Sequence, residues 1–436
     1  MADPARLREA LTEQVRRRYP EMGDAVADAL RAVPRHVFLP DQPVDLAYRD
    51  EAIVTRRDAG GTPISSSSQP TMMAIMLDQL ALEPGARVLE IGAGTGYNAA
   101  LMARLVGPEG AVVTVDIDAE VAEQAGERLR RAGFGDVTVV CADGVEGYAA
   151  GGPYDRLIAT VGVPDLAPAW LAQLKAEARI VVPIDVYGVQ CSIAFARDGD
   201  RWVSRSVRPC GFMRLRGEHA GPEPARVLDQ DSMLGLLFPD GRAVPGEAVR
   251  RLLAETPVAR PTGSRVGFLE LAGGLSVWLA MREPRWCMVA ELGTVASVAP
   301  SGEGAAESAV SSVSSVSSVS SVSSGRAPLE GLRMPGSGLA LTLGVLDDSG
   351  FCLLGGEADA PLSVYAYGPA GPSLAEDLAA HLAAWEEAGR PGVERLRVTA
   401  YPKGVPVEVP SGAVAVERPH TVLVLSWGPE ATPSPS

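Results

Sequence analysis

The feature that most constrains the fold is a glycine-rich turn in the sequence VLEIGAGTGYNAALMARL, residues 88–105. The apolar run at its start is followed by Gly92, Gly94 and Gly96, and helix-forming residues begin at Tyr97. Glycine allows positive φ and a close approach of the backbone to a ligand, and a helix N-terminus offers free N–H groups and a positive dipole. The stretch therefore predicts a buried strand, a ligand-binding turn and a helix.

Strand-like and helix-like segments alternate on both sides of this turn. The predicted strands are residues 87–91, 111–115, 137–141, 154–161 and 179–183, and the predicted helices are residues 5–18, 72–80, 97–105, 119–132 and 166–174. Such alternation is typical of a parallel sheet with helices on both faces. We therefore expect an α/β fold, a Rossmann-like domain with a doubly wound, mostly parallel sheet.

The spacing of the turn indicates which ligand it binds. Dinucleotide-binding turns have the pattern GxGxxG, whereas this turn reads E-x-G-x-G-x-G from Glu90 to Gly96, with Tyr97 where the last dinucleotide glycine would stand. This form suits the sulfonium and amino-acid end of S-adenosylmethionine, with Glu90 near the ammonium group. The sequence thus predicts S-adenosylmethionine as the cofactor of a methyltransferase domain.

Two acidic strand ends extend this prediction. Asp116 ends the next strand, twenty residues after Gly96, where a carboxylate can hold the two ribose hydroxyls. Asp143 and Gly144 follow the third strand, where adenine would lie. Each signal alone is common in α/β proteins, but all three fall in register on consecutive strands.

Composition limits the partners. The net charge of −15 and the pI near 4.9 argue against nucleic-acid binding and against anionic membranes. The five cysteines and four histidines are scattered, which favours reduced thiols and no metal site. The charged N-terminus lacks the apolar core of a signal peptide. We expect a soluble, cytoplasmic protein that acts on a peptide.

The alternation ends by about Gly217, so residues 1–217 are expected to form the catalytic domain and residues 218–436 a C-terminal α+β domain that recognises substrate. Within the second half, residues 308–325 are rich in Ser and Val and are predicted to be a flexible segment. The elements expected around it are a strand-like run at 276–279, a hairpin of 339–346 with 351–354, a helix at 374–388 capped by Ser373 and stopped by Gly389, and strands at 395–399 and 421–426.

Six stretches of the first half together resemble the protein-L-isoaspartate O-methyltransferase family. They are VPRHVFLP (33–40), AYRDEAI (47–53), EIGAGTGYNAA (90–100), ADGVEGY (142–148), YDRLI (154–158) and FMRLRG (212–217). The resemblance implies methyl transfer to the carboxylate of a β-linked aspartyl residue, after which the ester collapses to a succinimide. Since a carboxylate with a pKa of about 4 is ionised at neutral pH, no catalytic base is required.

One segment departs from the family pattern. Where the family usually has I-S-A-P-H-M, residues 67–72 read S-S-Q-P-T-M. Ser68 keeps the family serine and is the candidate catalytic residue that hydrogen-bonds the accepting carboxylate. Ser67 replaces an apolar residue and Thr71 replaces histidine; both are substrate-binding candidates, and Ser66 and Ser67 are also cofactor-binding candidates. Alternatively, residues 65–69 form only a polar turn that caps a helix starting at Pro70.

The altered segment and the extra half-chain resemble relatives found with ribosomally made, post-translationally modified peptides. This resemblance favours a methyltransferase that acts on an aspartyl carboxylate of a constrained precursor peptide and yields aspartimide and then isoaspartate. The alternative is a general repair enzyme for isoaspartyl residues in damaged proteins. A third possibility is a cofactor-binding scaffold without turnover, which the intact motif residues disfavour.

Overall fold

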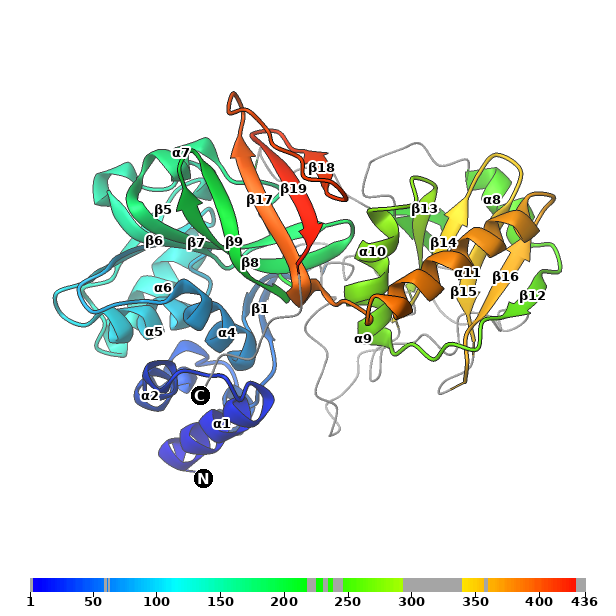
Figure 1. Cartoon of the computed structure of the whole chain (residues 1–436). Coiled ribbons are helices and arrows are strands. Elements are labelled where there is room, and N and C mark those ends of the chain that lie inside the picture. The colour runs from blue at the N-terminus through cyan, green and yellow to red at the C-terminus, as the bar shows by residue number, and fades with distance from the viewer. Residues whose placement is uncertain are drawn as a thin grey trace. The chain divides into compact units, whose positions relative to one another are not determined.

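The computed structural model describes residues 3–58, 61, 63–217, 225–229, 234–237, 246–292, 339–356 and 360–428. The chain divides into two compact units, each formed by more than one segment (Figure 1). The first contains Met1–Ile184, Cys191–Gly221 and Arg397–Ser426; the second contains Asp185–Gln190, Pro222–Leu396 and Trp427–Ser436. The segment predicted to be flexible, 308–325, lies outside the described residues.

The first unit is built on a ten-stranded sheet. In order across the sheet, its strands are β18 (Val414–Glu417), β19 (Thr421–Trp427), β17 (Leu396–Pro402), β9 (Arg201–Pro209), β8 (Val189–Asp198), β7 (Leu174–Val186), β6 (Tyr154–Ala159), β3 (Arg87–Ile91), β4 (Ala111–Asp116) and β5 (Thr138–Cys141). The pairs from β5 through β4, β3 and β6 to β7 are parallel. The pairs β8–β9, β9–β17 and β18–β19 are antiparallel. The expected Rossmann-like α/β fold is confirmed, although the sheet is mixed rather than mostly parallel.

Helices pack against this sheet and supply much of the core. They are α1 (Pro4–Arg18), α2 (Asp24–Ala32), α3 (Val44–Ala47), α4 (Pro70–Leu80), α5 (Tyr97–Val106), α6 (Ala119–Arg131) and α7 (Pro168–Ala172). Helices α1 and α2 pack on α4, and α2 also packs on α5. Their apolar side chains join those of β3, including Val88, in one buried cluster. A separate hairpin, β1 (Ile53–Arg57) with β2 (Pro63–Ser67), precedes α4.

The strand order fixes where a ligand site can lie. The chain runs from β3 outward to β4 and β5, then returns to the other side of β3 as β6. In open α/β sheets, ligands bind beyond the carboxyl ends of the strands at the point where the order reverses. Here that point is between the ends of β3 and β6, beside the glycine turn.

The last strands of the chain extend the first sheet. Strand β17 pairs with β9, with Thr399 opposite Val203, and β18–β19 continue the sheet beyond it. Residues 397–426 therefore belong to the first unit, and the prediction of one C-terminal domain over residues 218–436 is wrong for this segment. The difference arises because local patterns reveal a strand but not a partner strand nearly two hundred residues away.

The second unit contains a seven-stranded sheet whose neighbouring strands all pair antiparallel. Its strands, in order across the sheet, are β10 (Ala225–Asp229), β11 (Leu234–Leu237), β13 (Trp286–Leu292), β14 (Leu339–Leu346), β15 (Phe351–Gly355), β16 (Ser363–Tyr367) and β12 (Val258–Pro261). Its helices are α8 (Gly246–Leu253), α9 (Phe268–Glu270), α10 (Ser276–Ala280) and α11 (Gly371–Glu387). Helix α11 packs on β14, β15 and β16, and Trp385 is fully buried in this core.

Two local predictions in this unit were wrong. Residues 276–279 belong to helix α10, not to a strand, because a short apolar run does not distinguish a buried strand from a buried helix. Helix α11 begins at Gly371 with Ala370 at its N-cap, before the predicted capping residue Ser373. Gly389 has a φ of 77°, as expected for the residue that ends the helix. Within the described ranges, no helix is both long enough and apolar enough to cross a membrane.

Candidate active site

The glycine turn after β3 has a backbone that only glycine adopts readily. Gly92, Gly94 and Gly96 have φ values of 99°, 51° and 86°. A Cβ added to Gly92 would lie 2.8 Å from Oγ1 of Thr160, and one added to Gly94 would lie 3.3 Å from the carbonyl oxygen of Ser66. Gly96 is the N-cap residue of α5. The turn is therefore closely packed, and neighbouring protein atoms occupy the space that a side chain at these positions would need.

Hydrogen bonds fix the turn at the point where the strand order reverses. The Gly92 N–H donates to the carbonyl of Val115 at 2.7 Å. Thr160, which follows β6, donates its hydroxyl to the carbonyl of Gly92 at 2.7 Å and its N–H to that of Ile91 at 2.9 Å. The turn is thus connected to both neighbouring strands, β4 and β6.

Asp116 contacts the turn directly. One oxygen, Oδ2, accepts the N–H of Gly94 at 3.1 Å, and Oδ1 accepts the N–H of Asp118 at 3.1 Å. Asp118 in turn caps helix α6 by accepting from the N–H groups of Glu120 and Val121. The predicted residues Gly94 and Asp116 are therefore adjacent, and the carboxylate is half-buried at the carboxyl end of β4.

Asp143 and Gly144 follow the third strand, and Gly217 packs between Asp143 and Ile117, a residue that was not singled out from the sequence. A Cβ on Gly217 would lie 3.1 Å from Cδ1 of Ile117 and 3.2 Å from Oδ2 of Asp143. Ile117 directly follows Asp116 and is 39% exposed, unusual for an isoleucine at the end of a buried strand. A Cβ on Gly144 would lie 2.6 Å from Cγ2 of Ile91. An apolar residue directly after the acidic strand end is the signal that could have identified Ile117.

Glu90 lies inside the protein rather than on the surface of the site. Its side chain is fully buried; Oε1 accepts from Nδ2 of Asn98 at 2.8 Å and Oε2 from the hydroxyl of Thr114 at 2.7 Å. Burial raises the pKa of Glu90 to about 7, although both hydrogen bonds oppose the shift. Within the part of the chain that the structure describes, no donor reaches the buried amide oxygen of Asn98.

The serine-rich segment divides between strand and loop. Ser65, Ser66 and Ser67 belong to β2, with Ser66 opposite Val54, and helix α4 begins at Pro70 as predicted. Gln69 is the N-cap residue but makes no side-chain capping bond. The reading of the whole segment as a capping turn therefore fails for the three serines in β2. Ser66 is placed against the glycine turn through its carbonyl oxygen.

A buried arginine organises this region, and the sequence analysis did not single it out. Arg35 is fully buried, and its guanidinium donates to the carbonyls of Ala47, Arg49, Glu51 and Ser68 and to the hydroxyl of Ser67. Burial lowers the pKa of Arg35 to about 10, so it remains a cation at neutral pH. Its planar set of donors suits several carbonyls at once. Arg35 thus connects the loop after α3 to the segment that carries Ser68.

Thr71 is part of a second buried network. Its hydroxyl donates to Oδ2 of Asp50 at 2.6 Å and its N–H to Oδ1 at 2.8 Å. Asp50 is 2% exposed and also pairs with Arg18 at 2.5 Å. Ser67, 2% exposed, accepts from Arg35 at 3.3 Å. Both residues that depart from the family pattern therefore make internal hydrogen bonds, whereas Ser68 is half-buried in the loop between them.

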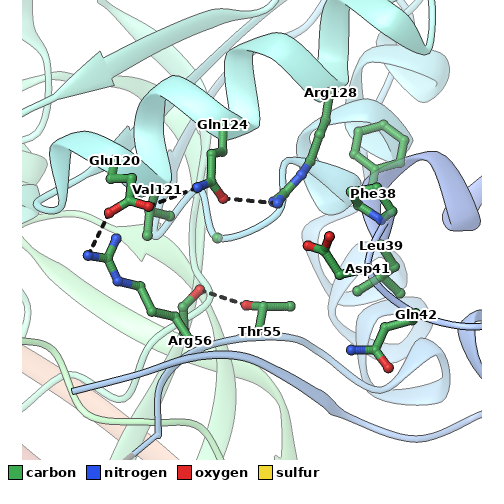
Figure 2. Close-up of a pocket in the computed structure, with 13 residues that line it drawn as sticks. Phe38, Leu39, Asp41, Gln42, Thr55, Arg56, Glu120, Val121, Gln124 and Arg128 are labelled. Atoms are coloured by element: carbon green, nitrogen blue, oxygen red, sulfur yellow. Dashed lines mark hydrogen bonds and ion pairs between the residues drawn. The ribbon is translucent and has the colours of Figure 1, made fainter. Parts of the chain in front are cut away.

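A polar cavity of about 190 Å³ lies beside Gly94 and Ser65 (Figure 2). Figure 2 shows side chains from helix α6, the hairpin and residues 38–42 around it. Arg56 pairs with Glu120 at 2.8 Å, Gln124 bonds to both Glu120 and Arg128, and Thr55 bonds to Ser65. The charged lining residues are Arg56, Arg128, Asp41 and Glu120, two of each sign. Such a lining suits polar groups without a large net charge.

Known proteins match the first half of the chain, which contains the residues described above. The family model described as "Protein-L-isoaspartate(D-aspartate) O-methyltransferase (PCMT)" matches residues 6–220. A protein-L-isoaspartate O-methyltransferase from Methanopyrus kandleri is 38% identical over 221 residues, which cover 50% of this chain and 95% of the relative. One from Thermotoga maritima is 41% identical over 166 residues, 38% of this chain and about half (52%) of that relative.

A solved structure titled protein-L-isoaspartate O-methyltransferase is 25% identical, with a TM-score of 0.47, and the match covers 90% of this chain and 96% of that one. The near-complete coverage of the Methanopyrus kandleri relative establishes kinship on sequence. S-adenosylmethionine is the cofactor to which the fold and this kinship point. The chain therefore belongs to the protein-L-isoaspartate O-methyltransferase family and is an S-adenosylmethionine-dependent carboxyl methyltransferase.

Proposed function

We infer that this chain methylates the free carboxylate of L-isoaspartyl residues in peptides and proteins. The observation that carries the proposal is the register of the glycine turn, Asp116 and Asp143 at the carboxyl ends of three consecutive parallel strands. This arrangement occurs in a segment 38% identical to a relative named for that activity. The cofactor and acceptor sites can be assigned residue by residue.

The residues of the turn fit S-adenosylmethionine, which supplies an electrophilic methyl group when bound. Gly92, Gly94 and Gly96 have positive φ, and we assign the backbone of this turn to the amino-acid end of the cofactor. We assign Asp116, which bonds to the turn, to the ribose hydroxyls. We assign the exposed Ile117, with Asp143 and Gly144, to adenine. Glu90 is buried, so its influence on the ammonium group would pass through Asn98, whose amide it holds.

The acceptor side needs positioning rather than a base. A carboxylate is already ionised at neutral pH, and alignment of two reactants can lower a barrier by roughly 7–11 kcal/mol. Ser68 follows β2, and its carbonyl is held by Arg35 at 3.1 Å. Its hydroxyl is the group we assign to the accepting carboxylate. The polar cavity beside Ser65 and Gly94, with two charges of each sign, would suit a peptide.

Two kinds of acceptor are compatible with this chemistry, and the isoaspartyl residue is better supported. Ser67 and Thr71, which suggested an altered specificity, are engaged with Arg35 and Asp50. The relatives are named for isoaspartate. The second candidate, an ordinary aspartate in a constrained peptide that closes to aspartimide, is suggested by the same two substitutions and by the second unit.

A pair of peptides tests the proposal. One linear peptide carries a single isoaspartate, and its control is identical except for an ordinary aspartate. We expect a base-labile methyl ester on the first peptide only, detected by mass spectrometry. For Ser68→Ala we expect slower turnover, because the activation barrier rises by about 1.5–3 kcal/mol when one hydrogen bond to a charged group is lost. Ser206→Ala, at a half-buried serine of β9 outside the proposed sites, is the matched control. Methylation of neither linear peptide, together with loss of water from a constrained aspartyl peptide, would replace the proposal by the second candidate.

A further inference from the structure

The last strand of the chain is bonded to the loop that follows β6. Asp165 in this loop is 4% exposed. Its Oδ2 accepts from the N–H groups of His420, at 2.6 Å, and Thr421, at 3.0 Å. Its Oδ1 accepts from the hydroxyl of Thr421 at 2.5 Å and from the N–H of Leu166 at 2.7 Å. Thr421, the first residue of β19, is fully buried and is joined to Asp165 across 256 positions of sequence.

The same loop, residues 160–166, contacts two parts of the candidate cofactor site. Thr160 holds the glycine turn through its hydroxyl bond to Gly92. Two positions later, the N–H of Gly162 donates to Met213, and the carbonyl of Gly162 accepts from Leu215, both at 2.8 Å. The segment that contains Met213 and Leu215 leads to Gly217, which packs against Asp143 and Ile117. The loop therefore contacts the glycine turn through Thr160. Through Gly162 it holds the segment that leads to Gly217, on the side of the site assigned to adenine.

The position of the buried Asp165 carboxylate is sensitive to the loss of one hydrogen-bond donor. A buried carboxylate is stable only when hydrogen bonds replace its hydration. Three of the four donors here come from residues 420–421, and only one comes from the loop itself. Without the C-terminal segment, Asp165 would have to turn toward water, and the loop from Thr160 to Leu166 would move with it.

We propose that Asp165 and Thr421 are positioning residues, through which the C-terminal strand β19 holds the loop after β6 and so sets the affinity for S-adenosylmethionine. This rests on the proposed placement of the cofactor at the glycine turn. It assigns to residues near the end of the chain a role in a site formed by residues 88–217. Residues 397–426 then contribute to cofactor binding as well as extending the sheet of the first unit.

The test uses the full chain and two matched substitutions. Thr421→Val keeps the shape of the side chain but removes the hydroxyl, whereas Thr421→Ser keeps it. Ser204→Ala removes another buried bond to the C-terminal segment, the one that Ser204 Oγ accepts from the N–H of Val398 at 2.9 Å, far from the loop in sequence. Calorimetry gives the dissociation constant for S-adenosylmethionine, urea unfolding gives stability, and hydrogen exchange without cofactor reports on residues 160–166.

We expect Thr421→Val to weaken cofactor binding by about fivefold or more, the lower end of usual coupling between distant sites, and to speed exchange in the loop. Thr421→Ser should restore both, and Ser204→Ala should lose stability but keep the parental affinity. Parental affinity and exchange in Thr421→Val, or equal weakening in Ser204→Ala, would overturn the inference alone. A parent chain that binds no S-adenosylmethionine would overturn the proposed cofactor site and this inference together. Asp165→Asn is the second variant if Thr421→Val does not fold.

Discussion

Asp116 has two tasks at the end of β4, and they can be separated by substitution. It holds the Gly94 N–H through Oδ2 and the Asp118 N–H through Oδ1, and it is assigned to the ribose hydroxyls. Asp116→Asn keeps the shape and one acceptor but removes the charge. Since hydrogen bonds to a charged group contribute roughly 1.5–3 kcal/mol, we expect S-adenosylmethionine affinity to fall about tenfold or more.

Calorimetry on the folded variant measures this change in affinity. Asp136→Asn, a substitution at an exposed carboxylate in a loop, is the matched control and should leave the affinity unchanged. Equal affinities of Asp116→Asn and the parent would mean that the ribose does not lie at Asp116.

Glu90 predicts a dependence of stability on pH. Its pKa is about 7 in the folded protein because burial disfavours the charged form, whereas an unfolded glutamate titrates near about 4.3. Between these values the unfolded chain releases a proton that the folded chain retains. The contribution of the protonated Glu90 to the free energy of unfolding is therefore fully present below about pH 4.3 and is lost as the pH rises through about 7.

Glu90→Gln, which does not titrate, isolates the effect. We expect the free energy of unfolding of the parent, relative to this variant, to fall by up to about 3 kcal/mol between pH 4.5 and 7, at about 1.4 kcal/mol for each pKa unit. Urea unfolding at several pH values measures the difference, with the exposed Glu109→Gln as control. A parent–variant difference that does not change with pH would contradict the prediction.

At the scale of elements, Arg35 joins the loop after α3 to the end of β2. Arg35→Lys keeps the positive charge, but an ammonium group cannot reach carbonyls as far apart as those of Ala47, Glu51 and Ser68. Each buried carbonyl left without a donor costs about 1–3 kcal/mol. We expect the variant to lose stability by about that amount or more, and to lose methyl transfer to a greater extent than cofactor affinity.

The two readouts distinguish a role near the acceptor from a general loss of structure. Denaturant unfolding gives the stability. The turnover number kcat and the cofactor dissociation constant, measured separately, show whether the acceptor side or the cofactor side of the site has changed. The matched control is Arg57→Lys, at an exposed arginine of β1 that bonds to the carbonyl of Gly61. Parental turnover in folded Arg35→Lys would show that the position of Ser68 does not depend on this network.

The elements differ in how far the sequence could predict them. The glycine turn, Asp116 and Asp143 were predicted because their signals are local: a spacing of glycines and an acidic residue at the end of an apolar run. Arg35 was not, because its partners are backbone carbonyls up to 33 positions away, and no local pattern marks them. Thr71 was assigned to substrate from family position, while its bond to Asp50 depends on a contact 21 positions distant.

At the scale of the whole molecule, the division of the chain was the least accessible feature. Strands 395–399 and 421–426 were predicted as strands, and the structure confirms β17 and β19 there. Strand propensity does not state which sheet a strand joins, however, and both lie in the sheet of the first unit. Most of the second unit, Pro222–Leu396, is thus inserted in sequence between parts of the first unit. We propose that the second unit contributes to recognition of the peptide beyond the methylated residue.

This insertion predicts different results for two deletions that remove most of the second unit. A chain that stops at Gly217 loses β17, β18 and β19, so the edge of β9 is exposed and Asp165 loses three of its four donors. A chain in which residues 222–396 are replaced by a long Gly/Ser linker keeps these strands. We expect the first to unfold at lower urea concentration and to bind S-adenosylmethionine at least about fivefold more weakly than the second. Calorimetry and urea unfolding, with the full chain as reference, measure both quantities. Equal affinity and stability in the two shortened chains would show that residues 397–426 add nothing to the catalytic unit, because the two chains differ chiefly in those strands.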